Sequence, residues 1–131
     1  MEQRNPIQEA ERYIQNARKI LSEKAGKDGN YYTDRKYVRM AGHTAWIGVL
    51  IALDAALQVK NGLKKGQRPD IKDYQEAIAK ADKKMSRQLI SSYDTLHKIL
   101  GYDGHLNYDV VQIGLNEAQG IIDWAGIRYK N

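Results

Sequence analysis

The sequence predicts an all-α protein: an antiparallel helical bundle of four principal helices plus one short helix. Apolar residues recur at intervals of three and four along most of the chain. No stretch shows sustained alternation of apolar and polar residues between hairpin turns. The chain has 131 residues, the length of one domain, so we assign residues 1–131 to a single bundle. Its 42% apolar residues are enough to form a core at this length without disulfides or metal.

The first predicted helix begins at Asn5, a good N-cap, followed by Pro6 at the first helical position. It closes at Lys24, Ala25 and Gly26, before a polar loop over residues 27–30. Its apolar positions are Ile7, Ala10, Ile14, Ala17 and Leu21.

The second predicted helix begins near Thr33 or Asp34 and runs to about Gln58. Its wide apolar face predicts the most buried helix of the bundle. Gly48 lies inside it, where a glycine costs about 1 kcal/mol relative to alanine, and this indicates a close helix approach or a bend. The apolar positions are Val38, Ala41, Ala45, Val49, Ala52, Leu53 and Ala56.

Residues 61–69 form a predicted linker, and Asp70 caps the short helix that follows. The helical pattern weakens at 80–84, where we expect a kink or break. A further helix ends at Gly101, and Asn107 is the expected N-cap of the last helix. The apolar positions of these segments are Ile71, Tyr74, Ala77, Ile78, Ala81, Met85, Leu89, Tyr93, Leu96, Leu100, Val111, Leu115, Ala118, Ile122 and Ala125.

Composition excludes several function classes. The chain has no cysteine, which removes zinc fingers, thiol nucleophiles and redox dithiols. Its longest mainly apolar stretch, Ala45–Val59, is interrupted by Asp54 and is short for a membrane span. The charged N-terminus has no apolar segment of the kind found in signal peptides. We therefore expect a cytoplasmic protein without a membrane partner.

The net charge of +5 is concentrated in one segment, Lys60–Arg87, where basic residues outnumber acidic ones by nine to four. Elsewhere the charges cancel. If the protein contacts a polyanion, this segment is the predicted surface, since cations that neutralise phosphates give salt-dependent binding. The alternative is a solvated loop whose charges only aid solubility. The candidate residues are Lys60, Lys64, Lys65, Arg68, Lys83, Lys84 and Arg87.

Three segments carry a resemblance to known proteins: Asp34–Trp46, Leu50–Leu57 and Tyr93–Gly104. Together they resemble a family of short bacterial helical proteins that has no assigned function. An Ala-rich second helix and a late helix with a tyrosine are also distantly similar to the HEPN superfamily, many of whose members are ribonucleases or partners of nucleotidyltransferases. The catalytic Arg and His of that superfamily stand further apart, on a late helix. Arg39 and His43 have three residues between them on the second helix, so no active site is carried over.

Two helical positions are the candidates for chemistry. Asp54 lies in an apolar run, and a buried carboxylate needs a polar partner from another helix, for which we favour His97 or Tyr93. That contact either fixes helix packing or serves a site. Arg39 and His43 stand one turn apart, so the pair can hold an anion and transfer a proton, or act as ordinary surface residues beside Trp46.

We expect neither metal nor cofactor, because the three histidines lack the spacings of metal-binding motifs. The sequence favours a binding or assembly role without catalysis, with homodimerisation and an RNA or protein partner left open. The first alternative is a HEPN-like RNA-directed nuclease that uses Arg39 and His43. The second is a nonenzymatic RNA-binding module that uses the basic segment.

Overall fold

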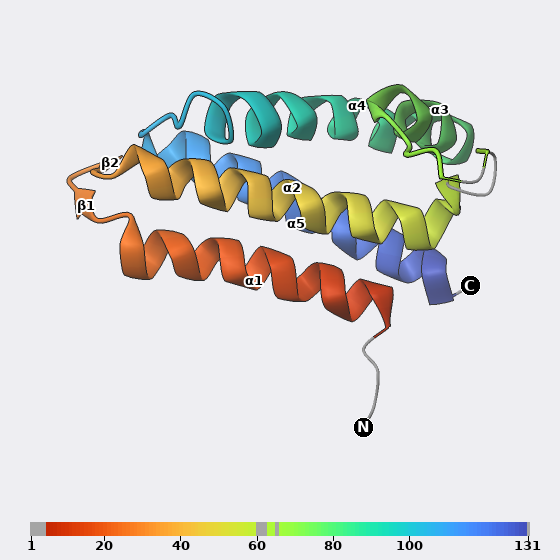
Figure 1. The fold of residues 1–131 in the computed structure, drawn as a ribbon, viewed down its shortest axis with the longest axis horizontal. Helices are drawn as coiled ribbons and strands as arrows, with labels where there is room; N and C mark the ends of the chain where they lie inside the picture. The colour runs from red at the N-terminus through yellow and green to blue at the C-terminus, as the bar shows by residue number, and fades with distance from the viewer. Residues whose placement is uncertain (1–4, 60–62, 65, 131) are drawn as a thin grey trace.

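The computed structural model describes residues 5–59, 63, 64 and 66–130, and it confirms the all-α bundle. Four long rods form the bundle: α1, α2, α5, and α4 continued by the π-helical segment η2 (Figure 1). The short helix α3 packs at one end. The bounds are α1 Pro6–Lys24, β1 Lys27–Asp28, β2 Tyr31–Tyr32, α2 Arg35–Leu57, α3 Ile71–Ala81, α4 Lys83–Ser92, η2 Tyr93–Leu100 and α5 Tyr108–Lys130.

Helix α2 is at the centre of the packing. It contacts α1, α5 and η2, while α4 and η2 also pack on α5 (Figure 1). Rods that are neighbours in sequence run antiparallel, and α2 and α5 point the same way (Figure 1). The core lies between these rods, and its largest fully buried side chains include Ile14, Leu53, Leu89, Leu96 and Leu115.

The helix boundaries follow from the caps that the sequence predicts. Asn5 and Gln8 form a capping box at α1, and Asp70 and Asp73 form another at α3. Asp34 accepts a hydrogen bond from the backbone of α2. The other two caps are equally local: Asp82 ends α3 and begins α4, and the Asn107 Oδ1 accepts from Val110 N at the start of α5. The expected break at 80–84 is therefore confirmed, with a cap at its centre.

The predicted loop after α1 contains a small hairpin that the sequence analysis missed. Lys27 pairs with Tyr32 and Asp28 with Tyr31, so the turn consists of Gly29 and Asn30. Gly29 has a φ of +58°, which glycine adopts readily. Strands of two residues are too short to show alternation, and this explains why the pattern gave no signal.

The helix that ends at Gly101 also differs from expectation, because its second half is wound as a π-helix. Gly101 N donates to Leu96 O at 2.9 Å, and Asp103 N donates to Lys98 O at 2.9 Å, both across five residues. π-helical turns are rare in proteins, and those that occur are often found at functional sites. Tyr93 and His97 lie within this segment.

Two glycines of α2 allow close helix contacts. A Cβ on Gly48 would lie 3.1 Å from Ala10 O and Tyr13 Cβ of α1, which confirms the predicted close approach. A Cβ on Gly42 would lie 2.7–2.8 Å from Leu100 Cβ, Gly101 N and Leu96 O. Any larger residue at 42 would therefore push η2 away from α2.

By length and composition alone, α2 could cross a membrane, since an 18-residue window has a mean hydropathy of 1.5. In the bundle 44% of that window is buried. A core helix of a soluble protein passes the same test, because burial against other helices also selects apolar residues. The finding is thus weak evidence for a span, and the expected lack of a membrane partner stays a prediction.

Candidate functional site

Four rings from two segments meet on one side of the bundle. His43 and Trp46 come from α2, and Tyr93 and His97 come from η2. The His97 ring stacks on Tyr93 at 4.9 Å between centroids, and the His43 ring meets the His97 ring edge-on at 6.1 Å. Trp46 lies 5.4 Å from Tyr93 and 6.4 Å from His97. We refer to these four residues as the imidazole cluster.

The close approach of η2 to α2 places the cluster. Gly42 leaves room for Leu100 and Gly101, and the imidazole of His43 then lies against Gly101. His43 is exposed and His97 is half-buried. The His97 Nδ1 is buried and has no hydrogen-bond partner. Most buried polar atoms in proteins have a hydrogen-bond partner, so this nitrogen stands out among the described residues.

Arg39 stands one turn before His43, as predicted, but its side chain is already engaged. Its Nε donates to Tyr102 O at 3.0 Å, and the neighbouring Arg35 donates to Asp103 O and Gly104 O at 3.0 and 3.2 Å. Both arginines therefore satisfy carbonyl groups where η2 ends, which is a structural use of the guanidinium group. Arg39 remains exposed, so its other N–H groups face solvent.

The chemistry available to the imidazole cluster is that of two imidazole rings, with the exposed Arg39 one turn before His43. Imidazole exchanges protons near neutral pH, so two of them can act as an acid and a base on one substrate. The aromatic rings of Trp46 and Tyr93 add a surface on which a planar group can stack. His43 and His97 are separate candidates in the sequence, because helical periodicity does not show which helices pack together.

Asp54 lies apart from the imidazole cluster and is bound from a different helix. The Tyr74 hydroxyl of α3 donates to Asp54 Oδ1 at 2.9 Å. The prediction of a partner on another helix is confirmed, but the favoured partners, His97 and Tyr93, are wrong. They stack on one another and face Trp46, while α3 packs at the far end of α2.

Tyr74 is 5% exposed, and this burial, together with the bond to Asp54, raises the pKa of its hydroxyl well above the ordinary value of 10. The hydroxyl is therefore a permanent donor at neutral pH. The pair joins the short helix α3 to the bundle, which agrees with a packing contact.

The basic segment is only partly described. Lys60 and Lys65 lie outside the described residues. Lys64 and Arg68 are exposed before α3, and Lys83, Lys84 and Arg87 are exposed on the first turns of α4. Cations at a helix N-terminus oppose the helix dipole, which favours negative charge there. Helix stability therefore does not account for the three residues of α4.

The outward side of α2 carries an apolar stripe that the sequence analysis did not separate from the core face. Met40 and Ile47 are 43% and 44% exposed. Thr44 and Ile51 lie between and beyond them at intermediate exposure. We refer to Met40, Thr44, Ile47 and Ile51 as the α2 stripe. In Figure 1, α2 lies in front, between α1 and the η2 rod.

Three cavities lie between described residues away from the imidazole cluster. One of 630 Å³ lies between the ends of α2, α3 and α5, and one of 370 Å³ lies between α1, the hairpin and α5. A third, of 260 Å³, lies near the start of α1 and the end of α5. Among the described residues, no group of three or more His, Asp or Glu side chains is arranged to hold a metal.

Comparison with known proteins places the chain in a family. A protein of unknown function from Dyadobacter fermentans has a similar structure, with a TM-score of 0.83 and 41% sequence identity over 94% of each chain. No curated protein matches the sequence. A family model described as a domain of unknown function (DUF5618) matches residues 5–126, nearly the whole bundle. The chain therefore belongs to the DUF5618 family.

Proposed function

We propose that this protein acts by binding and assembly, as a homodimer whose two copies pair through the α2 stripe. The observation that carries the proposal is the pair of large apolar side chains, Met40 and Ile47, that α2 leaves 43% and 44% exposed. Between Met40 and Leu53 the helix has no charged residue other than the titratable His43. An uncharged strip of this kind on the most apolar helix is typical of an interface core.

The charges at the ends of the stripe favour a second copy as the occupant. Lys36 and Asp54 are eighteen residues apart, which is five turns, so they project from the same side of α2 about 27 Å apart. In an antiparallel pair of α2 helices, Lys36 of each copy lies near the Asp54 end of the other, where the Asp54 carboxylate keeps its hydrogen bond from Tyr74. A two-fold interface is self-complementary in this way, because each contact occurs twice.

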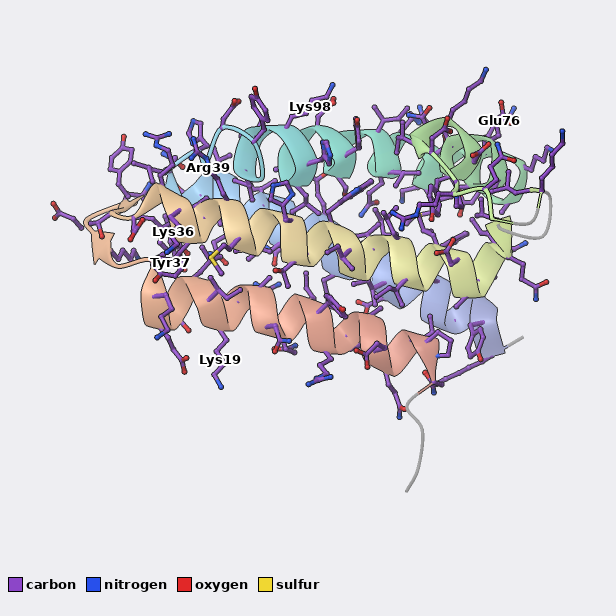
Figure 2. All side chains as sticks on the ribbon, viewed as in Figure 1. Lys19, Lys36, Tyr37, Arg39, Glu76 and Lys98 are labelled. Carbon is purple, nitrogen blue, oxygen red and sulfur yellow. The ribbon has the colours of Figure 1, made fainter. Side chains whose placement is uncertain are left out.

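The same pairing places one apolar pair and one apolar–imidazole pair opposite each other. Centred near Ala45, it sets Met40 against Leu50 of the partner subunit and Ile47 beside His43 of the partner subunit. Figure 2 shows Lys36 at the start of α2, at one end of this surface.

The test is the oligomeric state, measured by sedimentation velocity over a wide range of concentration. Ile47→Lys should weaken dimerisation at least about tenfold, because each copy would then bury an unpaired lysine ammonium group in the interface. Ile113→Lys is the matched control: Ile113 is 58% exposed on α5, outside the stripe, and its change should leave dimerisation intact. Lys36→Glu should also weaken the dimer, and Lys19→Glu, on α1, should not.

Three outcomes would overturn the proposal. They are a wild-type protein that stays monomeric at the highest concentration, a dimer that survives Ile47→Lys, and binding of the monomer to lipid vesicles through the same stripe. The last outcome would assign the apolar face of α2 to a membrane surface instead of a second copy.

A second candidate function is favoured by the imidazole cluster: RNA cleavage in which His43 and His97 act as acid and base. The supporting observation is that two histidines 54 positions apart in sequence have rings 6.1 Å apart, beside Trp46 and one turn from Arg39. Against it, the Arg39 Nε is taken up by a backbone carbonyl. We therefore expect purified protein to leave total RNA intact. Cleavage that disappears in both His43→Ala and His97→Ala, with the fold retained, would promote this function over assembly alone.

A further inference from the structure

A cleft of 370 Å³ opens between the second half of α1, the hairpin and the start of α5. Its volume lies within the range of small-molecule sites, about 300–1,000 Å³. Three segments far apart in sequence contribute to the cleft, so no local sequence motif predicts it. The lining residues relevant to binding are Arg18, Leu21, Lys27, Tyr32, Tyr108 and Gln112.

The polar groups of this cleft are mostly donors. Gln112 Nε2 donates to the Tyr32 hydroxyl at 2.9 Å, which leaves the hydrogen of that hydroxyl available for another acceptor. Arg18 donates from one terminal nitrogen to Asn116 Oδ1 at 3.2 Å and keeps further N–H groups. No Asp or Glu lines the cleft, and within the described part of the chain neither Arg18 nor Lys27 pairs with a carboxylate.

The walls of the cleft are aromatic and apolar. The rings of Tyr32 and Tyr108 lie 5.6 Å apart at 38°, and the Lys27 ammonium stands 3.8 Å from the centre of the Tyr108 ring. Leu21 is buried behind them. Tyr32 is 5% exposed, and this burial raises the pKa of its hydroxyl, so the group stays protonated and can donate.

We propose that this cleft binds a small molecule that joins an anionic group, a phosphate or a carboxylate, to a planar ring. Arg18, Lys27 and the Tyr32 hydroxyl face the anion, whose oxygens accept hydrogen bonds from these donors. The planar ring lies against the apolar wall, at the edge of the Tyr108 ring whose face Lys27 covers. Charge-assisted hydrogen bonds from a guanidinium group to such anions are among the strongest polar contacts in proteins.

The test is isothermal titration calorimetry with four probes. Adenosine monophosphate and indole-3-acetate carry both an anion and a ring, adenosine carries only a ring, and inorganic phosphate carries only an anion. At least one of the first two should bind about tenfold more tightly than adenosine and than phosphate, and the one that binds shows whether the cleft prefers a purine phosphate or an indole carboxylate. Equal affinity for all four probes, or no binding by any, would overturn the proposal.

Variants locate the site. Arg18→Gln and Lys27→Gln should each weaken the binding of the better probe about tenfold, the effect of losing one charged hydrogen bond. Lys19→Gln is the matched control, because Lys19 follows Arg18 in the chain but points away from the bundle (Figure 2). Lys27 lies on the exposed hairpin, so its variant keeps the test decisive if Arg18→Gln fails to fold.

Two further readouts separate this site from the α2 stripe. Probe binding should shift the NMR signals of the Tyr32 and Tyr108 rings, and it should be equally tight in the Ile47→Lys variant. Shifts confined to α2, or affinity lost with Ile47→Lys, would place the ligand at the dimer surface and refute the assignment of the cleft.

Discussion

Removing the Asp54 carboxylate should loosen α3 from the bundle, and the structure sets the size of the effect. The Tyr74 hydroxyl that it binds is 2.9 Å away on a ring only 5% exposed, so Asp54→Ala strands a buried donor. A hydrogen bond to a charged group contributes about 1.5–3 kcal/mol, and Asp54 is only half-buried, so we expect the free energy of unfolding to fall by about 1–3 kcal/mol. For a bundle of this size that is about 3–10 °C in Tm.

A double-mutant cycle isolates the pair from the other contacts of Asp54. Urea unfolding of wild type, Asp54→Ala, Tyr74→Phe and the double variant should give a coupling energy of at least about 0.5 kcal/mol. Tyr74→Phe keeps the buried ring, so it serves as the matched change that removes only the hydroxyl. Additive single effects, or an Asp54→Ala midpoint equal to that of wild type, would refute the reasoning.

The remaining predictions concern pH, packing and charge. The pKa of the Tyr74 hydroxyl is raised in the folded state, so above pH 10 the unfolded state loses this proton first. The stability of wild type should therefore fall as the pH rises through that range. In the same urea titrations, the stability of Tyr74→Phe should fall less. Gly42→Ala should lower the free energy of unfolding by about 1–3 kcal/mol, because its Cβ would meet backbone atoms of η2. Gly120→Ala should be neutral or stabilising, because its Cβ would meet only the flexible Gln88 amide. Thermal unfolding of both variants measures the difference. Any binding of single-stranded RNA should weaken steeply with salt in a filter-binding assay, and should be lost when four lysines of the basic segment are changed to Gln; binding that survives these changes would place the contact elsewhere. These four are Lys64, Lys65, Lys83 and Lys84.

The sequence was sufficient where the determinants are local. Asn5, Asp34, Asp70 and Asn107 mark the starts of four helices because a cap acts on backbone groups two or three residues away. Most core positions followed from the spacing of apolar residues, since a helix presents the same face every three or four residues, but the buried Ile121 was missed and Tyr93 is only partly buried. The sequence also predicted that Asp54 has a polar partner, because the free-energy cost of an unpaired buried carboxylate depends only on that residue and its apolar neighbours.

Only the tertiary structure decided which residues meet. Tyr74 and not His97 binds Asp54, because the break at Asp82 folds α3 back against the end of α2. His97 meets His43 because Gly42 admits η2 to close contact, and π-helical turns have no pattern that the apolar spacing reveals. The cleft of Arg18, Tyr32 and Tyr108 is likewise built from three distant segments. Helical periodicity gives the direction of each side chain from its own axis, whereas the choice of neighbour depends on how the axes pack, and that is settled by the whole core at once.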